Sequence, residues 1–490
     1  MSLDEQELVR RKKLADLQQS GQDPFSITAF PKEYQSRDII DNYEDLEKAN
    51  VAVAGRMVLK RVMGRASFAH ILDEFGKLQI YVACDEVGEA AYASFKDWDL
   101  GDIIGVKGFV FKTKTGEISV HAKEIVLLAK AVKPLPDKYH GLRDAETRYR
   151  ERYVDLIANP EVRDIFKTRS TVIRSIREYL DNESFLEVET PILQNIVGGA
   201  EARPFATHHN ALNMDMFLRI SLELYLKRLI IGGFERVYEI GRVFRNEGIS
   251  YKHNPEFTML EMYEAYTDIN GMMDRTEAII RYVLKAATAH TVLKYEEHDI
   301  DFTRPFRRVT MVDLVRETTG MDFAKDNLAN IEKRMAGEYQ CDMPKERTWG
   351  RLLFAAFDQL VEKTIVQPTF VLEHPVEISP LAKKKAGDPR LTQRFELFIC
   401  CREMANAYSE LNDPIDQRER FMQQMAEREK GNDEAQMLDE DFLNAMEYGM
   451  PPTGGLGIGI DRLVMLVTGV HSIRECLLFP TMKPTGGVVR

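Results

Sequence analysis

The chain has 490 residues, 44% of them hydrophobic and 29% charged, which is enough for two or three globular domains rather than a single core. Its formal net charge of -12 excludes a protein that coats nucleic acid indiscriminately, although a local basic patch could still make a specific contact. Five cysteines without CxxC spacing, a charged start and no apolar run of membrane-spanning length predict a cytoplasmic protein with no membrane partner.

The N-terminal part divides into a helical extension, residues 1–50, and a run of short strands. From 51 to 135, alternating apolar runs broken by glycines and one helical insert predict a five-stranded OB-fold β-barrel. Such barrels often bind single-stranded nucleic acid, stacking bases on aromatic rings and reading base edges with polar groups. Phe68 and Gln79 lie on strands where they could do this, although a place in the barrel core is the commoner outcome for Phe68.

A linker, residues 136–160, leads into the larger part of the chain, 161–490. A long helix is expected over 161–182. The strand FLEVETPIL follows, and Pro191 ends it or places it at a sheet edge because proline has no N–H for a central ladder.

The run FLRISLELYLKRLIIGG predicts a strand followed by a helix. Ser221 is expected to cap that helix, because a serine hydroxyl can accept a bond from a free N–H of the first turn. Glu223 would then lie in the first turn, where the helix dipole favours an acid.

The stretch from Arg236 to Tyr266 predicts two antiparallel strands joined by a polar loop. Alternate side chains of a strand share a face, which gives one set on each strand: Val237, Glu239, Gly241, Val243, Arg245 and Glu247, then Phe257, Met259, Glu261 and Tyr263. A buried face would carry Val, Ile and Leu rather than a cation, acids and rings. We interpret this face as a site, with a solvated hairpin as the lesser alternative.

Helices are expected over 270–295, over most of an insertion at about 324–363, and over 414–430. TFVLEHPVEISPLAKKK predicts a strand and then a basic loop, and RFELFICCREMANAYSEL predicts a further extended run. Strands separated by long helical insertions, around a mainly antiparallel set, indicate an α+β catalytic domain.

The C-terminal run GGLGIGIDR places three glycines, Gly455, Gly457 and Gly459, on one face of a strand. A face without side chains suits a flat ring or a ribose laid against the backbone. Asp461 and Arg462 then open an apolar helix, so the guanidinium is expected at the edge of that bare surface, where it could stack on a base or hold a phosphate.

A third group of polar residues comprises Glu396, Glu403, Asn406 and Glu410. Glu396 and Glu403 are an odd number of residues apart, so the chain must bend near Cys400-Cys401 for both to meet one ligand. Two such carboxylates suit divalent cations that keep water and bridge phosphate oxygens. There is no P-loop, so phosphate binding is expected to depend on side chains and metal ions.

The runs FRNEG, HNPEF and GLGIGIDR resemble motifs 2 and 3 of class II aminoacyl-tRNA synthetases, and FLEVETP resembles motif 1. GGAEARPF, ELYLKR, HPVEISPLAKK and NAYSEL are similar to runs of the lysine-specific members. The resemblance implies an antiparallel catalytic sheet flanked by helices, an anticodon-binding OB barrel and a homodimer. It also implies that ATP activates L-lysine as an adenylate, with more than one Mg2+ bridging the phosphates, before transfer to the terminal adenosine of tRNA(Lys).

The resemblance further implies a role for each matching residue. For ATP these are Arg245 at the α-phosphate, Glu247 at the adenine amino group, His253 and Asn254 near phosphates and ribose, and Phe257 and Arg462 around the ring. For lysine they are Gly199, Glu223, Arg245, Glu261, Tyr263, Asn406 and Glu410, and for magnesium Glu396 and Glu403. Phe68 and Gln79 would contact the anticodon.

Three departures from the family pattern concern the backbone. Ser184 stands where glycine is usual, which is expected to strain a left-handed helix end. Leu222 replaces a proline before Glu223, and Cys400-Cys401 must bend without glycine's freedom.

Three rival functions are weaker. An aspartate or asparagine synthetase needs a pocket for an acid or an amide, which Glu223 and Glu410 would repel or leave unpaired. The ligase that modifies elongation factor P lacks the barrel. A non-catalytic tRNA-binding relative would be expected to have lost Arg245, Arg462 or the paired acids, and all are present.

Overall fold

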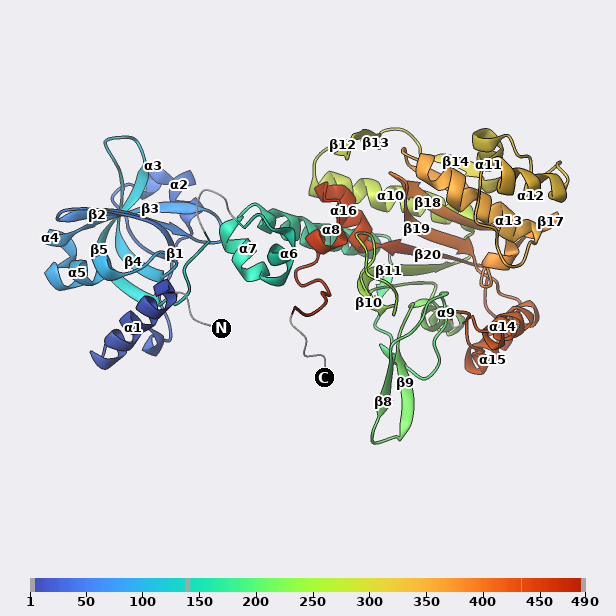
Figure 1. The fold of residues 1–490 in the computed structure, drawn as a ribbon, viewed down its shortest axis with the longest axis horizontal. Coiled ribbons are helices and arrows are strands. Elements are labelled where there is room, and N and C mark those ends of the chain that lie inside the picture. The colour runs from blue at the N-terminus through green and yellow to red at the C-terminus, as the bar shows by residue number, and fades with distance from the viewer. Residues whose placement is uncertain (1–4, 137–141, 433, 486–490) are drawn as a thin grey trace. The chain divides into compact units, whose positions relative to one another are not determined.

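The computed structural model describes residues 5–136, 142–432 and 434–485. The chain forms two compact units, Met1–Arg143 and Asp144–Arg490 (Figure 1). The expected linker 136–160 includes residues 137–141, and the expected helical extension 1–50 includes residues 1–4; both sets lie outside the described residues.

The first unit is a closed barrel with strand order β1-β2-β3-β5-β4, which confirms the predicted OB-fold. Its strands are β1 Asn50–Met63, β2 Ala66–Leu72, β3 Lys77–Ala83, β4 Ile103–Lys112 and β5 Ile118–Ala129. Its helices are α1 Glu5–Gln19, α2 Ser36–Asp41, α3 Tyr43–Leu46, α4 Cys84–Val87 and α5 Glu89–Asp97. Alternate β-branched side chains such as Ile80 and Val82 are fully buried, so one face of each strand makes the barrel core.

The second unit is built on an eight-stranded sheet of order β14-β15-β18-β19-β20-β11-β10-β6. The strands are β6 Leu186–Glu187, β10 Arg236–Phe244, β11 Glu256–Ala265, β14 Arg307–Thr310, β15 Thr369–Leu372, β18 Arg394–Ile399, β19 Arg402–Ser409 and β20 Thr453–Gly459. The pairs are antiparallel except at the two edges, where β6 and β14 run parallel to their neighbours. The mainly antiparallel α+β architecture predicted from the sequence is confirmed.

Helices and small strands surround this sheet. The helices are α6 Ala145–Arg150, α7 Arg152–Ala158, α8 Val162–Asn182, α9 Glu223–Ile231, α10 Ile269–Ala287, α11 Met311–Thr319, α12 Leu328–Gly337, α13 Trp349–Ala356, α14 Pro414–Glu429, α15 Glu440–Glu447, α16 Ile460–Thr468 and α17 Ile473–Cys476. The small strands are β7 Leu193–Gln194, β8 Ala206–His209, β9 Met214–Leu218, β12 Val292–Tyr295, β13 His298–Asp301, β16 Lys384–Lys385 and β17 Asp388–Thr392.

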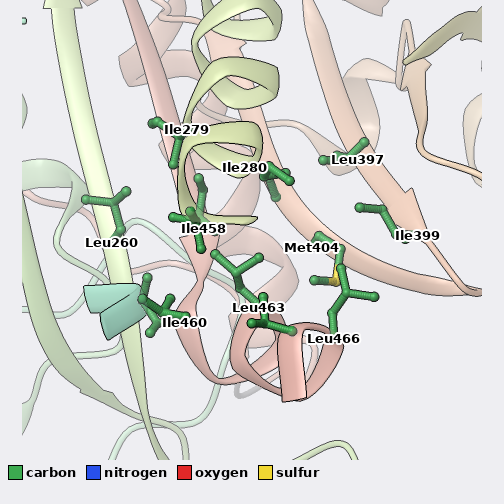
Figure 2. Packing of buried hydrophobic residues seen from close by; sticks show 14 of the residues in the cluster. Leu260, Ile279, Ile280, Leu397, Ile399, Met404, Ile458, Ile460, Leu463 and Leu466 are labelled. Atoms are coloured by element: carbon green, nitrogen blue, oxygen red, sulfur yellow. The ribbon is translucent and has the colours of Figure 1, made fainter. Parts of the chain in front are cut away.

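The main core lies between one face of the sheet and helices α8, α10 and α16. Figure 2 shows its packing, in which Leu260, Leu397 and Ile458 from three strands meet Ile280 and Leu463 from α10 and α16. Successive side chains of a strand point to opposite faces, so the residues next to these three belong to the other face. That other face carries the polar residues of the site.

Three sequence-based expectations differ from the structure. The strand FLEVETPIL is reduced to the two residues of β6 at the sheet edge, with β7 beginning after Pro191. The helix expected to reach residue 295 ends at Ala287, and β12 follows. The cap of α9 is Leu222 rather than Ser221, although the Glu223 N–H still donates to the Ser221 hydroxyl at 3.2 Å.

Ser184 adopts a left-handed conformation, with φ of 63°, directly after α8. That conformation costs a residue with a side chain roughly 1 kcal/mol, whereas glycine adopts it freely. Ser184→Gly is therefore expected to raise the free energy of unfolding by about 0.5 to 1 kcal/mol, visible as a higher apparent melting temperature. The control is Ser170→Gly at an exposed position inside α8, which should lower stability by a similar amount. If both glycine variants changed the free energy of unfolding equally and in the same direction, the left-handed conformation of Ser184 would not be the cause.

Candidate active site

A cavity of about 440 Å³ lies on the polar face of the large sheet. Fourteen residues expected at the ATP, lysine and magnesium sites line it together: Gly199, Glu223, Arg245, Glu247, His253, Asn254, Phe257, Glu261, Tyr263, Glu396, Glu403, Asn406, Glu410 and Arg462. They come from segments far apart in the sequence, so the sheet order is what collects them.

The register of β11, β20 and β19 sets the floor of the cavity. Two rows cross these strands: Tyr263, Gly455 and Tyr408, then Glu261, Gly457 and Asn406. The bare glycine face predicted from the sequence therefore lies between two strands that carry polar and aromatic side chains. A Cβ on Gly455 would lie 1.9 Å from Glu410 Oε1 and 2.6 Å from the Tyr263 ring, so only glycine leaves room for both.

The two strands of the predicted hairpin pair as expected, with Glu239 opposite Glu261 and Val243 opposite Phe257. Strand β10 ends at Phe244, however, so the expected alternation through to Glu247 is wrong. One further backbone bond joins the Arg245 N–H to the Pro255 carbonyl at 2.8 Å, after which the chain turns and Glu247 lies in the loop. Arg245 and Glu247 reach the cavity from the strand end rather than from its face.

Arg245 is half-buried and its guanidinium lies 5.2 Å from the centre of the Phe257 ring. Within the part of the chain that the structure describes, no carboxylate forms an ion pair with Arg245, and its buried Nε has no hydrogen-bond acceptor. Burial lowers the pKa of Arg245, while Glu247 and Glu403 act in the opposite direction. An arginine remains charged at neutral pH, so this cation is available to an anionic ligand.

The loop after Arg245 contributes His253 and Asn254. Burial, and then the charges of Arg462, Lys252 and Arg245, lower the pKa of His253, which favours the neutral imidazole. Asn254 is tied to the backbone at both ends, because its amide donates to the Glu256 carbonyl at 2.7 Å and accepts from the Thr481 N–H at 3.2 Å. This pattern favours a role in holding the loop.

The bend expected at Cys400-Cys401 is confirmed. Both residues have positive φ, 50° and 57°, and a register shift follows between β18 and β19. These two irregularities let Glu396 and Glu403 line the same cavity. Turning a hairpin without glycine places strain on two side-chain-bearing residues.

The two acids of this hairpin each meet an arginine. Arg394 donates to Glu396 Oε1 at 2.6 Å, and Arg462 Nη1 donates to Glu403 Oε2 at 3.1 Å and to its backbone carbonyl at 2.7 Å. Among residues 5–136, 142–432 and 434–485, no group of three His, Cys, Asp or Glu could hold a metal ion. Two carboxylates still fit magnesium, which keeps water and takes oxygens from bound phosphates.

Glu261 is buried and accepts three hydrogen bonds, from Ser221 Oγ at 2.8 Å, the Leu222 N–H at 2.9 Å and Tyr263 Oη at 3.0 Å. Leucine in place of proline at position 222 supplies one of them, because proline has no N–H. Burial, and then the charge of Glu223, nevertheless raise the pKa of Glu261 to about 7. Glu261 is therefore a carboxyl group poised to change charge near neutrality.

Glu410 is almost completely buried, and its Oε1 accepts no hydrogen bond from any described residue. One oxygen, Oε2, forms an ion pair with Lys227. Lys227 also donates to Glu223, whose other oxygen accepts from the Tyr408 hydroxyl at 2.7 Å. The sequence interpretation missed Lys227 and Tyr408. A lysine four residues after Glu223, and therefore on the same side of the helix, was the available signal for Lys227.

Phe68 and Gln79 lie in the other compact unit, on the outer face of the barrel. Phe68 is half-buried between buried neighbours, so the alternative that places it in the barrel core is wrong. Its ring lies 5.0 Å from that of Tyr81, which in turn lies 4.9 Å from His121. Gln79 accepts from Ser119 at 2.8 Å on the same face. The sequence interpretation missed Tyr81 and His121, which the alternation of their strands could have identified.

Nowhere in the described ranges does a helix have both the length and the apolar character that a bilayer crossing requires.

Comparison with known proteins gives two family matches. The tRNA synthetases class II (D, K and N) family matches residues 144–483, and the OB-fold nucleic acid binding domain matches residues 51–128. Among curated proteins, the lysine–tRNA ligase of Clostridium acetobutylicum is 55% identical over 97% of this chain and 93% of its own. Those of Thermoanaerobacter sp. (strain X514) and Clostridium tetani are 55% and 54% identical, each over 97% of this chain and 95% of its own.

Proposed function

The chain belongs to the class II tRNA synthetases, and from that membership we propose that it is a lysine–tRNA ligase whose cavity activates L-lysine with ATP. Relatives of this name match nearly the whole chain, including the barrel. The observation that carries lysine in particular is the group of three buried carboxylates that line the cavity, those of Glu223, Glu261 and Glu410. One internal cation, Lys227, pairs with two of them, so negative charge remains that a cationic ligand can balance.

In the proposed reaction an oxygen of the lysine carboxylate attacks the α-phosphorus of ATP. The bond from that phosphorus to the bridging oxygen breaks, and pyrophosphate leaves with the electron pair. The lysyl-adenylate then passes lysine to the 3'-terminal adenosine of tRNA(Lys), releasing AMP. Such phosphoryl chemistry depends on positioning and charge neutralisation and needs no protein nucleophile.

Arg245 is proposed to hold the α-phosphate and the lysine carboxylate. Its guanidinium has no competing carboxylate among the described residues, so both anions can bind without breaking an existing ion pair. Phe257 lies beneath it at 5.2 Å, which leaves the ring as one wall of the adenine site. Arg462, fixed by Glu403, is proposed as the opposite wall.

The loop after Arg245 is proposed to supply the remaining contacts with the nucleotide. Glu247, exposed in the loop, would accept from the adenine amino group. The neutral imidazole of His253 would donate to a phosphate, and Asn254 would hold the loop near the ribose.

Lysine–tRNA ligases depend in general on ATP and magnesium. We propose that Glu396 and Glu403 hold magnesium ions, which when bound neutralise charge on the phosphates. Each carboxylate gives one oxygen to an arginine in this structure, Glu396 to Arg394 and Glu403 to Arg462, which would leave its other oxygen for a metal ion.

The lysine side of the cavity is proposed to bind two ammonium groups. Gly199, with φ of 86°, packs so closely that a Cβ would lie 2.8 Å from Ser221 Oγ, which brings its carbonyl and Glu223 to the α-ammonium. Glu410, with Tyr263 and Asn406, would take the ε-ammonium, and Glu261 supports Tyr263. Three buried acids would repel aspartate and leave asparagine's amide poorly matched.

Lysine affinity is expected to depend on pH through Glu261. The pKa of this group is raised from 4.5 to about 7, so its contribution to stability is complete below about pH 4.5 and is lost as the pH rises through 7. Ammonium groups favour the ionised carboxylate, so lysine should bind more tightly at about pH 8 than at about pH 6, with proton release near pH 7. Titration calorimetry in two buffers measures the number of protons that are released when lysine binds. Glu261→Gln should abolish it, and release unchanged in that variant would contradict the assignment.

A homodimer is proposed from the sheet edge at β6. Four exposed apolar side chains lie on or near this edge: Leu186, Ile192, Leu193 and Ile196. Such a patch is expected to be covered by a second copy through the segment that resembles motif 1. Light scattering should give twice the mass of one chain.

A cytoplasmic location is proposed with the role in protein synthesis.

The barrel is proposed to bind the anticodon of tRNA(Lys). Phe68 and Tyr81 offer stacking rings, and Gln79 offers a polar edge beside them.

The proposed function is tested by ATP–pyrophosphate exchange across a panel of amino acids. Exchange should require L-lysine and magnesium. Exchange driven by another amino acid, or by none, would overturn it.

A further inference from the structure

Lys227 is a buried cation behind the wall of the cavity. Its side chain is completely buried, and it does not line the cavity itself. Its Nζ lies between Glu223 Oε1 and Glu410 Oε2, and the Tyr408 ring centre is 5.6 Å away. Both acids do line the cavity, so Lys227 can act on a ligand only through them.

Lys227 stays charged in this position. Burial lowers the pKa of Lys227, but the negative charges of Glu223 and Glu410 and their hydrogen bonds outweigh it and raise the pKa above its ordinary value. An ammonium buried without such partners would instead lose its proton. The three groups therefore form one charged unit.

Lys227 also decides which carboxylate oxygens face the cavity. It occupies Oε2 of Glu410, which leaves Oε1 above the bare backbone of Gly455. It occupies Oε1 of Glu223, whose Oε2 accepts from Tyr408. Lys227 therefore fixes one oxygen of each carboxylate from outside the cavity.

The charge balance of the lysine side follows from this arrangement. Three carboxylates, of Glu223, Glu261 and Glu410, face one ammonium, so the fully ionised group carries a net charge of minus two. L-lysine brings two ammonium groups, while its carboxylate is assigned to Arg245. The side chains of the pocket therefore leave negative charge that the two ammonium groups of a diamino acid balance.

We propose that Lys227 is a positioning and specificity residue, a fixed internal cation that keeps Glu223 and Glu410 ionised and aligned and so matches the pocket to a ligand with two ammonium groups. This inference rests on the proposed function of the same cavity. Without Lys227, three buried carboxylates would face one another, and at least one would take up a proton. Lysine would then have to displace that proton to bind.

The test replaces Lys227 with methionine, which keeps most of the length of the side chain and removes its charge. The KM for lysine in pyrophosphate exchange is expected to rise about 30-fold or more at about pH 7, and the KM for ATP should change by less than about twofold. The loss should shrink as the pH is raised toward 9, because the proton that Glu410 takes up among Glu223, Glu261, Tyr263 and Tyr408 is then lost more readily. A loss independent of pH, or equal for ATP, would overturn the proposal.

Arg228→Met is the matched control. Arg228 is the next residue of α9 and pairs with Asp439 at 2.8 Å outside the cavity. The KM of the Arg228→Met variant for lysine should stay within about twofold of the wild-type value at every pH. A pH-dependent rise in this variant would show that any cation of α9 acts in the same way and would overturn the assignment to Lys227.

A second measurement needs only the wild-type protein and therefore does not depend on the folding of the variant. Lysine binding at about pH 8, followed by calorimetry in two buffers, should release less than one proton, because the charge of Lys227 opposes the burial that raises the pKa of Glu410. Release of a full proton or more would overturn the proposal. If lysine supports no exchange at all, the proposed function fails instead, so the two failures are distinguishable.

Discussion

Replacing Arg245 with alanine is expected to lower lysine-dependent ATP–pyrophosphate exchange by about 10²- to 10³-fold while the protein remains folded. The guanidinium is half-buried, lies over Phe257 and has no carboxylate partner among the described residues. Its charge is therefore available where negative charge develops at the α-phosphorus. Removing one such preorganised donor typically costs about 3 to 4 kcal/mol of transition-state stabilisation.

The control for this prediction is Arg242→Ala, three residues earlier on β10, where the side chain is exposed. Exchange should stay within about twofold of wild type, because an exposed charge away from the cavity contributes little. Circular dichroism and the apparent melting temperature establish that both variants fold. Wild-type exchange by folded Arg245→Ala would remove Arg245 from the reaction.

Glu410→Gln is expected to raise the KM for lysine about 100-fold or more and to leave the KM for ATP nearly unchanged. The amide cannot balance the ε-ammonium, and the loss of a hydrogen bond between two charged groups costs about 1.5 to 3 kcal/mol. Lys227 also loses one of its two carboxylate partners, which adds to the loss because these side chains are buried. Initial-rate measurements with each substrate varied separately give both constants.

Glu247→Gln provides the reciprocal comparison, because Glu247 lies in the loop on the nucleotide side. It is expected to weaken ATP more than lysine, since an amide accepts more weakly from the adenine amino group. Equal losses for both substrates in either variant would refute the division of the cavity into a nucleotide part and a lysine part.

Much of the site follows from local sequence patterns. The spacing of Gly455, Gly457 and Gly459 predicted a bare strand face, and the structure places that face between β11 and β19. The alternation around Glu261 and Tyr263 likewise predicted side chains on one surface. Period-two patterns carry this information because strand geometry is nearly independent of the surrounding fold.

Other features were outside the reach of local patterns. The alternation of side chains along a strand shows that Phe68 shares a face with the residues two positions before and after it. It does not show whether that face is inside or outside the barrel. Arg245 belongs to the same alternating run as Val243, yet the strand ends before it. Burial and strand ends depend on contacts with distant segments, which the run itself does not contain.

The sequence alone therefore determined the antiparallel α+β class, the OB barrel, the family and the residues that line the cavity, because these depend on periodicity and on motifs within short runs. Only the tertiary structure decided which charges meet. Lys227 and Glu410 come from a helix and a strand end far apart in the chain, and their ion pair exists because the fold buries both in one low-dielectric space. The electrostatic state of the lysine pocket is a property of that enclosure.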